Sequence, residues 1–238
     1  MIKELSFENQ KIWYDDSLLL EDPKRCFDPE YWKSNDRVIG SARGRGTTWF
    51  VKTMKGEAAL RHYRRGGLFG KLIKDNYWFS GWGNTRSYQE LQLLNHLIQA
   101  GVNVPRPVAA RAIKGTFSYQ ADLLSEKIPN ARDLVSILKE RPLPPEMYKK
   151  IGLEVRKMHD AQTNHTDLNI HNILIDDQDK VWIIDFDKCV KQVGSQWKRR
   201  NLERLKRSFE KEVVKSGICW TLGDWSNLTR CVNEDICD

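Results

Sequence analysis

The sequence lacks a long hydrophobic run, and its few cysteines form none of the usual pairs. A membrane-spanning helix needs about 20 consecutive apolar residues, whereas polar side chains such as Asn95 and Asn103 interrupt the longest candidate, Leu91 to Pro105. The first residues include no apolar stretch, so we expect no secretory signal. Five cysteines without a Cys-x-x-Cys pair indicate a reducing cytoplasm, and we expect neither a disulfide framework nor a zinc site.

Positive charge is in excess. The 238 residues include 39 Lys and Arg against 32 Asp and Glu, which gives a formal net charge of +7. Such a surplus attracts anionic partners, among them nucleic acid, anionic lipid and phosphorylated substrates, and an ordinary basic surface explains it equally well. The length suits one large domain or two small lobes, and 40% hydrophobic with 30% charged residues is a globular balance. The net charge therefore favours an anionic partner and does not identify the class of that partner.

The first half of the chain is predicted to be mostly β-structure with one helix. A glycine-rich segment, Gly40 to Gly46, precedes Thr47–Lys52, whose β-branched and aromatic residues favour a strand. A turn and a return strand at 58–63 would complete a hairpin behind the glycine-rich segment. Leucines at helical spacing predict a helix over 85–100, which Gly101 would end.

The second half is predicted to become mainly helical. An apolar stripe follows a cluster of prolines, and the last residues combine a helical pattern with many basic side chains. The expected elements are strands at 108–113 and 116–124, a helix at 145–161, a hairpin of strands at 172–175 and 181–184, and helical structure from Gln196 onward. The predicted fold class is therefore α+β, with a β-rich N-terminal part and a mainly helical C-terminal part.

Two short polar motifs beside the predicted hairpin carry the chemistry. The first runs from His165 through Asp167 to Asn172, and the second begins at Asp185. Phosphoryl transfer from ATP needs an oriented acceptor hydroxyl and metal ions that neutralise the phosphates. Asp167 is the candidate base for the hydroxyl, while Asn172 and Asp185 offer the oxygen ligands that Mg²⁺ prefers. Because Asn172 and Asp185 adjoin the hairpin, we expect them to meet at one end of it, beside Asp167.

The pattern H-x-D-x-x-x-x-N followed by D-F resembles the catalytic and metal loops of the protein-kinase-like superfamily. A lone loop or an ordinary hairpin would explain each motif separately, but the ordered combination is far more specific. The resemblance implies a bilobal kinase that uses ATP and Mg²⁺. It also implies an N-terminal lobe at 1–126, with one main helix, and a C-terminal lobe at 127–238.

The resemblance extends, less closely, to the glycine-rich segment. Gly40, Gly44 and Gly46 would arch over the phosphates of ATP, with backbone N–H groups facing anionic oxygen. A glycine-rich hairpin tip is also common in proteins that bind no nucleotide. The glycines alone therefore do not decide between the two interpretations.

In the superfamily, the third strand carries a lysine, and this chain has an arginine in that place. Arg61 would hold the α- and β-phosphates of ATP, and Glu90, early in the predicted helix, would be its ion-pair partner. Lys52, on the preceding strand, is the competing candidate for phosphate binding. The alternative for Glu90 is a place on a solvated helix face.

Departures from the protein-kinase pattern point away from protein substrates. Thr166 replaces the Arg before the catalytic Asp, Asp187 replaces the Gly of D-F-G, and no A-P-E follows. Between Arg61 and Trp82, basic residues alternate with aromatics and glycines. Aromatic faces stack on sugar rings and cations bind carboxylate or phosphate, so this segment suits an anionic sugar. Its aromatics would otherwise belong to the core of a hairpin extension.

With this segment, the H-T-D loop and the D-F-D-K sequence, the chain resembles the lipopolysaccharide-core sugar kinases, most closely those that act on 3-deoxy-D-manno-octulosonic acid (Kdo). The resemblance implies phosphorylation of the 4-hydroxyl of Kdo on a lipid A precursor, at the cytoplasmic face of the bacterial inner membrane. The enzyme would dock on that anionic surface as a peripheral protein, through Arg61 to Trp82 and the basic run from Trp197 to Lys215. Neither a nucleic acid nor a protein substrate is expected.

Two other functions stay open on the sequence. Another small-molecule kinase, of the aminoglycoside or choline type, would share both motifs without an evident need for the basic-aromatic segment. A non-catalytic nucleic-acid-binding protein would use Arg61, Arg64 and the basic C-terminal helix. Such a protein would have no reason to keep Asp167, Asn172 and Asp185 together.

Overall fold

The chain forms two compact units. The computed structural model describes residues 1–43, 46–64 and 75–233. The first unit comprises Met1–Gln92 and Arg106–Lys127, and the second comprises Leu93–Pro105 and Ile128–Asp238. The stretch Leu93–Pro105 thus packs with the second unit, whereas the lobes predicted at 1–126 and 127–238 assign it to the N-terminal lobe. The division into functional lobes stays a prediction.

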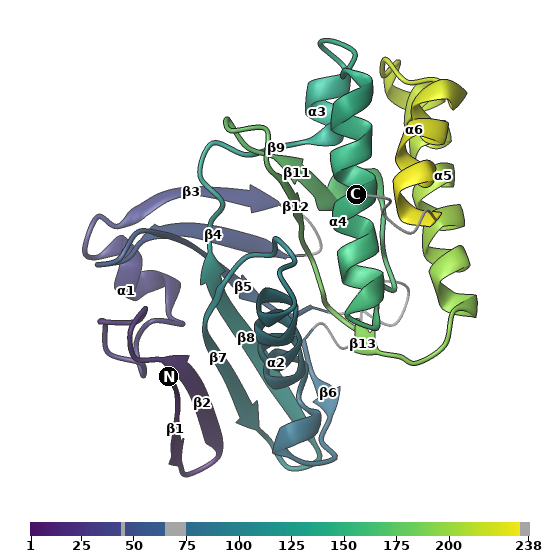
Figure 1. Ribbon diagram of the computed structural model, residues 1–238. Coiled ribbons are helices and arrows are strands. Elements are labelled where there is room, and N and C mark those ends of the chain that lie inside the picture. Colours follow the sequence, from purple (N-terminus) through teal and green to yellow (C-terminus); the bar gives the residue numbers. More distant parts are fainter. Residues whose placement is uncertain (44–45, 65–74, 234–238) are drawn as a thin grey trace. The chain divides into compact units, whose positions relative to one another are not determined.

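The first unit is built around one antiparallel sheet (Figure 1). Its eight strands in the described part of the chain run in the spatial order β1-β2-β7-β8-β5-β4-β3, and β6 also pairs with β8. The strands are β1 (Ile2–Phe7), β2 (Gln10–Asp15), β3 (Val38–Arg43), β4 (Thr47–Lys52), β5 (Glu57–His62), β6 (Tyr77–Trp78), β7 (Pro107–Lys114) and β8 (Ser118–Glu126). A short helix, α1 (Pro29–Lys33), and the first half of α2 (Arg86–Gln99) belong to the same unit.

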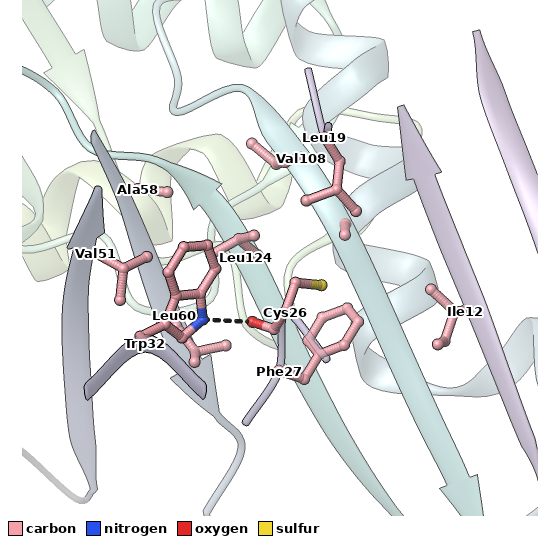
Figure 2. Packing of buried hydrophobic residues seen from close by; sticks show 11 residues of the cluster. Ile12, Leu19, Cys26, Phe27, Trp32, Val51, Ala58, Leu60, Val108 and Leu124 are labelled. Carbon is pink, nitrogen blue, oxygen red and sulfur yellow. Dashed lines mark hydrogen bonds between the residues drawn. The ribbon is translucent and has the colours of Figure 1, made fainter. Parts of the chain in front are cut away.

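Apolar side chains on one face of this sheet form a core. In Figure 2, Ile12, Val51 and Leu124 come from three different strands and pack in one cluster with Trp32 of α1. Trp32 is fully buried, and its indole Nε1 donates to the carbonyl oxygen of Cys26 at 2.9 Å. The large ring therefore contributes apolar burial while its polar atom keeps a partner.

The second unit is mainly helical. Its elements are β9 (Arg132–Asp133), α3 (Leu134–Leu138), α4 (Pro145–Asp160), β10 (Thr163–Asn164), the 3₁₀ turn η3 (Ile170–Asn172), β11 (Ile173–Ile175), β12 (Val181–Ile183), β13 (Val190–Lys191), α5 (Gln196–Ser216) and α6 (Leu222–Asn233). Strands β12, β11 and β9 form one small sheet, and β10 pairs with β13. The short strands connect the helices and carry the polar motifs described below.

Helices α4 and α6 pack closely because α4 has a glycine at their contact (Figure 1). A Cβ atom at Gly152 would lie 2.2 Å from the carbonyl oxygen of Leu228 in α6, which is closer than real Cβ atoms come. On α4, Ile151, Val155 and Met158 are fully buried. Their spacing is that of the apolar stripe of an amphipathic helix, as predicted.

The fold class is α+β, as expected. Helices α2 and α4 and the hairpin of β11 and β12 begin and end within one residue of the predicted positions. The N-terminal hairpin of β1 and β2 was not predicted. None of the helices within the described ranges is long and apolar enough to cross a bilayer.

Candidate active site

The hairpin of β11 and β12 brings the two polar motifs together. At its end, Ile184 N–H donates to the carbonyl oxygen of Asn172 at 3.0 Å, and Asp185 follows directly. The side-chain Nδ2 of Asn172 donates in turn to the backbone carbonyl of Asp167 at 3.0 Å. The structure thus joins Asp167, Asn172 and the start of the second motif at one end of the hairpin, as the sequence predicts.

The second motif, Asp185–Lys188, has an unusual backbone. Asp185 and Lys188 have φ values of 63° and 65°, in the left-handed region that residues with a Cβ atom rarely occupy and that is enriched at functional sites. Phe186 between them is buried, and its ring centroid lies 4.8 Å from that of His165. Packing of Phe186 therefore anchors a segment whose backbone is held away from its preferred conformations.

His165 links the first motif to the second. It is fully buried, its Nδ1 accepts from the N–H of Asp167 at 3.3 Å, and its Nε2 lies 3.0 Å from the carbonyl oxygen of Ile184. This pattern assigns the ring proton to Nε2, which donates to Ile184. Burial lowers the pKa of His165, so a neutral ring suits the site. His165 therefore supports the loop from within.

Helix α5 holds the catalytic loop, His165–Asn172, at three points. Asn201 Oδ1 accepts from the N–H of His165 at 3.2 Å, and Ser208 Oγ accepts from the N–H of Ile170 at 2.9 Å. The carboxylate of Glu212 lies 3.3 Å from Nε2 of His171. These hydrogen bonds satisfy loop groups that would otherwise be left without partners.

This role of α5 was not predicted, because the sequence indicates only a basic helix there. Asn201, Ser208 and Glu212 are spaced seven and four residues apart, so they lie on one stripe of the helix. Leu205, in the same stripe, is fully buried. A polar stripe that includes a leucine was the available signal in the sequence.

In the first unit, Arg61 and Glu90 form the predicted ion pair. Nη2 of Arg61 on β5 lies 2.5 and 2.6 Å from the two carboxylate oxygens of Glu90 on α2. Glu90 is buried, and Tyr63 also donates its hydroxyl to it at 2.6 Å. Lys52, the competing candidate, is exposed at the end of β4. The pairing matches the prediction, and Tyr63 is a third member that the sequence did not indicate.

Two of the three glycines expected to face the phosphates of ATP lie within the described residues. Gly40 lies within β3, opposite Phe50 of β4, at an irregularity in the strand register. Strands β3 and β4 extend to Arg43 and from Thr47, so the connection between them is shorter than the predicted loop. A Cβ atom at Gly46 would lie 2.9 Å from Cδ of Arg64, so a larger residue there would displace the Arg64 side chain. Gly44 lies outside the described residues.

Asn172 and Asp185 fit a magnesium ion by their chemistry. The amide nitrogen of Asn172 is already bonded to Asp167, so its amide oxygen is the atom left to bind a cation. Asp185 adds a carboxylate from the same end of the hairpin. Mg²⁺ usually binds one or two such side chains together with phosphate oxygens and water.

Comparison with known proteins agrees with this geometry. The sequence matches the lipopolysaccharide kinase (Kdo/WaaP) family over residues 29–231. It is 65% identical to 3-deoxy-D-manno-octulosonic acid kinase of Vibrio cholerae over 99% of this chain and 100% of that protein. It is 48% identical to the Haemophilus influenzae protein of the same name, over 95% of this chain and 98% of that protein.

A solved structure shares the fold. WaaP in complex with acyl carrier protein aligns with a TM-score of 0.57 and 20% sequence identity, over 90% of this chain and 87% of that one. At this identity the likeness shows the fold alone. The family match and the relatives, together with the geometry of the two motifs, establish that the chain belongs to the lipopolysaccharide kinase (Kdo/WaaP) family.

Proposed function

We propose that this protein transfers the γ-phosphoryl group of ATP to a hydroxyl of Kdo in the biosynthesis of the lipopolysaccharide core. The acceptor is the 4-hydroxyl of Kdo on a lipid A precursor. Family membership and the name shared by relatives at 48–65% identity support the reaction. The observation that carries the proposal is the meeting of Asp167, Asn172 and the Asp185 loop at one end of the hairpin.

Each residue of that group has a distinct task in the proposal. Asp167 orients the acceptor hydroxyl and accepts its proton. Asn172 and Asp185 hold Mg²⁺, which supplies the positive charge that neutralises the phosphates of ATP. His165 keeps both loops in register through its two ring nitrogens, and it takes no part in proton transfer.

Arg61 is the proposed phosphate-binding cation. An arginine fixed on a buried carboxylate presents a rigid fork to the α- and β-phosphates. Lys52 is the alternative. Gly40, Gly44 and Gly46 are proposed to lie near the phosphates, where backbone N–H groups would face anionic oxygen.

The protein is proposed to work on the cytoplasmic face of the bacterial inner membrane, docked on anionic lipid. Helix α5 exposes a row of cations at helical spacing: Arg207, Lys211 and Lys215. Each Lys or Arg near an anionic surface contributes ~1 kcal/mol of attraction.

Sedimentation with anionic vesicles at low salt should carry the protein down, and neutral vesicles should not. Protein that stays in the supernatant with anionic vesicles would contradict docking. Nucleic acid and protein substrates are not expected.

Mass analysis of the reaction product tests the function directly. The protein is incubated with labelled ATP and Kdo-lipid A precursor, and we expect one phosphate on the Kdo residue. The Asp167→Ala variant should bind ATP as the wild type does and lose turnover by ~10²–10⁴-fold. Near-normal turnover in that variant would remove Asp167 from the role of base. Phosphate on another part of the acceptor would overturn the choice of hydroxyl.

A further inference from the structure

A pocket of about 330 Å³ lies within the second unit, between the catalytic loop and α5. Its lining residues are Asn169, His171, Asn172, Ser208, Lys211 and Glu212. Asn169 and Asn172 both donate their side-chain N–H to the backbone carbonyl of Asp167, at 2.9 and 3.0 Å. The pocket therefore adjoins the residue proposed as the base, on the side where α5 meets the loop.

One wall of the pocket is a fixed anion. Glu212 is buried, and it accepts hydrogen bonds from Ser216 Oγ at 2.6 Å and from Lys215 Nζ at 3.3 Å. The hydrogen bond from Ser216, with those from Lys215 and His171, lowers the pKa of Glu212 to about 2. Glu212 is therefore ionised and already paired, and it holds the ring of His171 in place at 3.3 Å.

Lys211, which also lines the pocket, is a cation. Its side chain is exposed, and within the described residues its ammonium group makes no hydrogen bond or ion pair. Lys215, one turn further along α5, is already bonded to Glu212. Among the described residues, the lining of the pocket thus offers one cation without a bonded partner, beside the ion pair of Glu212 and Lys215. That balance suits a ligand with a single negative charge, because one unpaired cation would leave most of the charge of a triphosphate without a partner.

We propose that this pocket is the subsite for the acceptor sugar, and that Lys211 binds the carboxylate of the sugar acid. The inference rests on the proposed function, which supplies an acceptor that is an octulosonic acid. Such an acid carries one carboxylate and several hydroxyls, and a pocket of about 330 Å³ is within the size range of small-molecule sites. With the carboxylate on Lys211, a ring hydroxyl would lie toward the Asn172 end of the pocket, where the Asn172 amide is bonded to the backbone of Asp167. Lys211 is thus a specificity-determining residue.

The test compares Lys211→Met with Lys149→Met, which removes the same charge from α4, where Lys149 is partly exposed and pairs with Glu146. Steady-state kinetics are measured with Kdo-lipid A precursor and with the same acceptor after methyl esterification of the Kdo carboxylate. We expect Lys211→Met to raise the KM for the acceptor ~10-fold or more, as for loss of a charge-assisted hydrogen bond. The KM for ATP should not change, and Lys149→Met should behave as the wild type.

The esterified acceptor separates recognition in the pocket from attraction to a membrane. Esterification should weaken the wild type about as much as Lys211→Met does, and it should have no further effect on that variant. A general loss of membrane attraction would instead persist with the ester. An unchanged acceptor KM in Lys211→Met, or equal losses in both lysine variants, would overturn the inference.

The outcome is independent of the assignment of the base. Asp167→Ala decides the proposed catalytic role through turnover, whereas Lys211→Met decides the pocket through the acceptor KM. Because Lys211 is exposed and unpaired within the described residues, its replacement should leave the melting temperature unchanged. A variant that melts as the wild type and still binds the acceptor normally would therefore count against the pocket.

Discussion

Arg61 on β5 contacts both carboxylate oxygens of Glu90 on α2, although 29 residues separate the two in the chain. The pair is only partly exposed, and Tyr63 shares the same carboxylate. Each group restricts the others, so the guanidinium is held in one orientation before any nucleotide arrives. An oriented cation loses little conformational freedom when it binds phosphate.

The first prediction concerns this arginine. We expect Arg61→Ala to raise the KM for ATP and to lower kcat, with kcat/KM falling ~10-fold or more because charge-assisted hydrogen bonds are lost. Lys52→Ala is the control and should have little effect, since Lys52 lies exposed at the end of β4. The opposite pattern in the two variants would assign the phosphates to Lys52.

The second prediction concerns the metal. Asp185→Ala removes one of the two proposed oxygen ligands, so the concentration of Mg²⁺ needed for half-maximal activity should increase several-fold. A titration of activity against Mg²⁺ at saturating ATP measures this. Asp176→Ala, on the distal turn of the same hairpin, serves as the control because its carboxylate bonds only to that turn and to Trp182. An Asp185→Ala titration that coincides with that of the wild type would contradict the assignment.

The third prediction concerns the packing of α4 against α6. Gly152→Ala places a methyl group 2.2 Å from the carbonyl oxygen of Leu228, so the helices must separate. We expect a loss of ~1–3 kcal/mol in the free energy of unfolding, as for other overpacked sites. Gly83→Ala is the matched control, because a Cβ atom there meets nothing within 4 Å. Equal unfolding curves for the two variants would show that α6 can move at no cost.

The fourth prediction concerns pH. His62 on β5 lies 2.7 Å from Asp122 and 3.2 Å from Asp75, and the hydrogen bond to Asp122 raises the pKa of His62 above 6.5. Folding therefore favours the protonated ring. This stabilisation is complete below about pH 6.5, the ordinary pKa, and it is lost as the pH rises through the higher folded pKa.

Melting temperatures of the wild type and of His62→Asn, measured from pH 5.5 to 9, check this. The advantage of the wild type should be greatest at the acidic end and should shrink as the pH rises. A difference between the two proteins that stays constant over the range would mean that His62 does not change its charge on folding.

Much of the site could be predicted because its residues are close together in sequence or flank regular elements. Asp167 and Asn172 are five residues apart, and the hairpin between Asn172 and Asp185 has an apolar pattern that fixes its ends. Glu90 could be matched to Arg61 through the family resemblance, in which the ion-pairing Glu lies early in this helix. The sequence therefore predicts those contacts for which a local pattern allows only one arrangement.

The parts that could not be predicted depend on which elements meet. Ser208 and Glu212 read as ordinary positions of a basic helix until the helix is placed against the loop. Tyr63, directly after β5, and Gly152 on α4 have the same property, since a partner from a distant segment gives each its role. The pairing of Gly40 with Phe50 across β3 and β4 could not be predicted either, because it depends on where the two strands meet.

The support that α5 gives the catalytic loop also has a consequence for the order of events during synthesis. The partners Asn201, Ser208 and Glu212 follow their loop residues by 36, 38 and 41 positions along the chain. A growing polypeptide therefore leaves the ribosome with its loop complete and unsupported until most of α5 has emerged. The N–H groups of His165 and Ile170 must bond to water in that interval. The loop thus gains its last α5 partner only as the end of α5 leaves the exit tunnel.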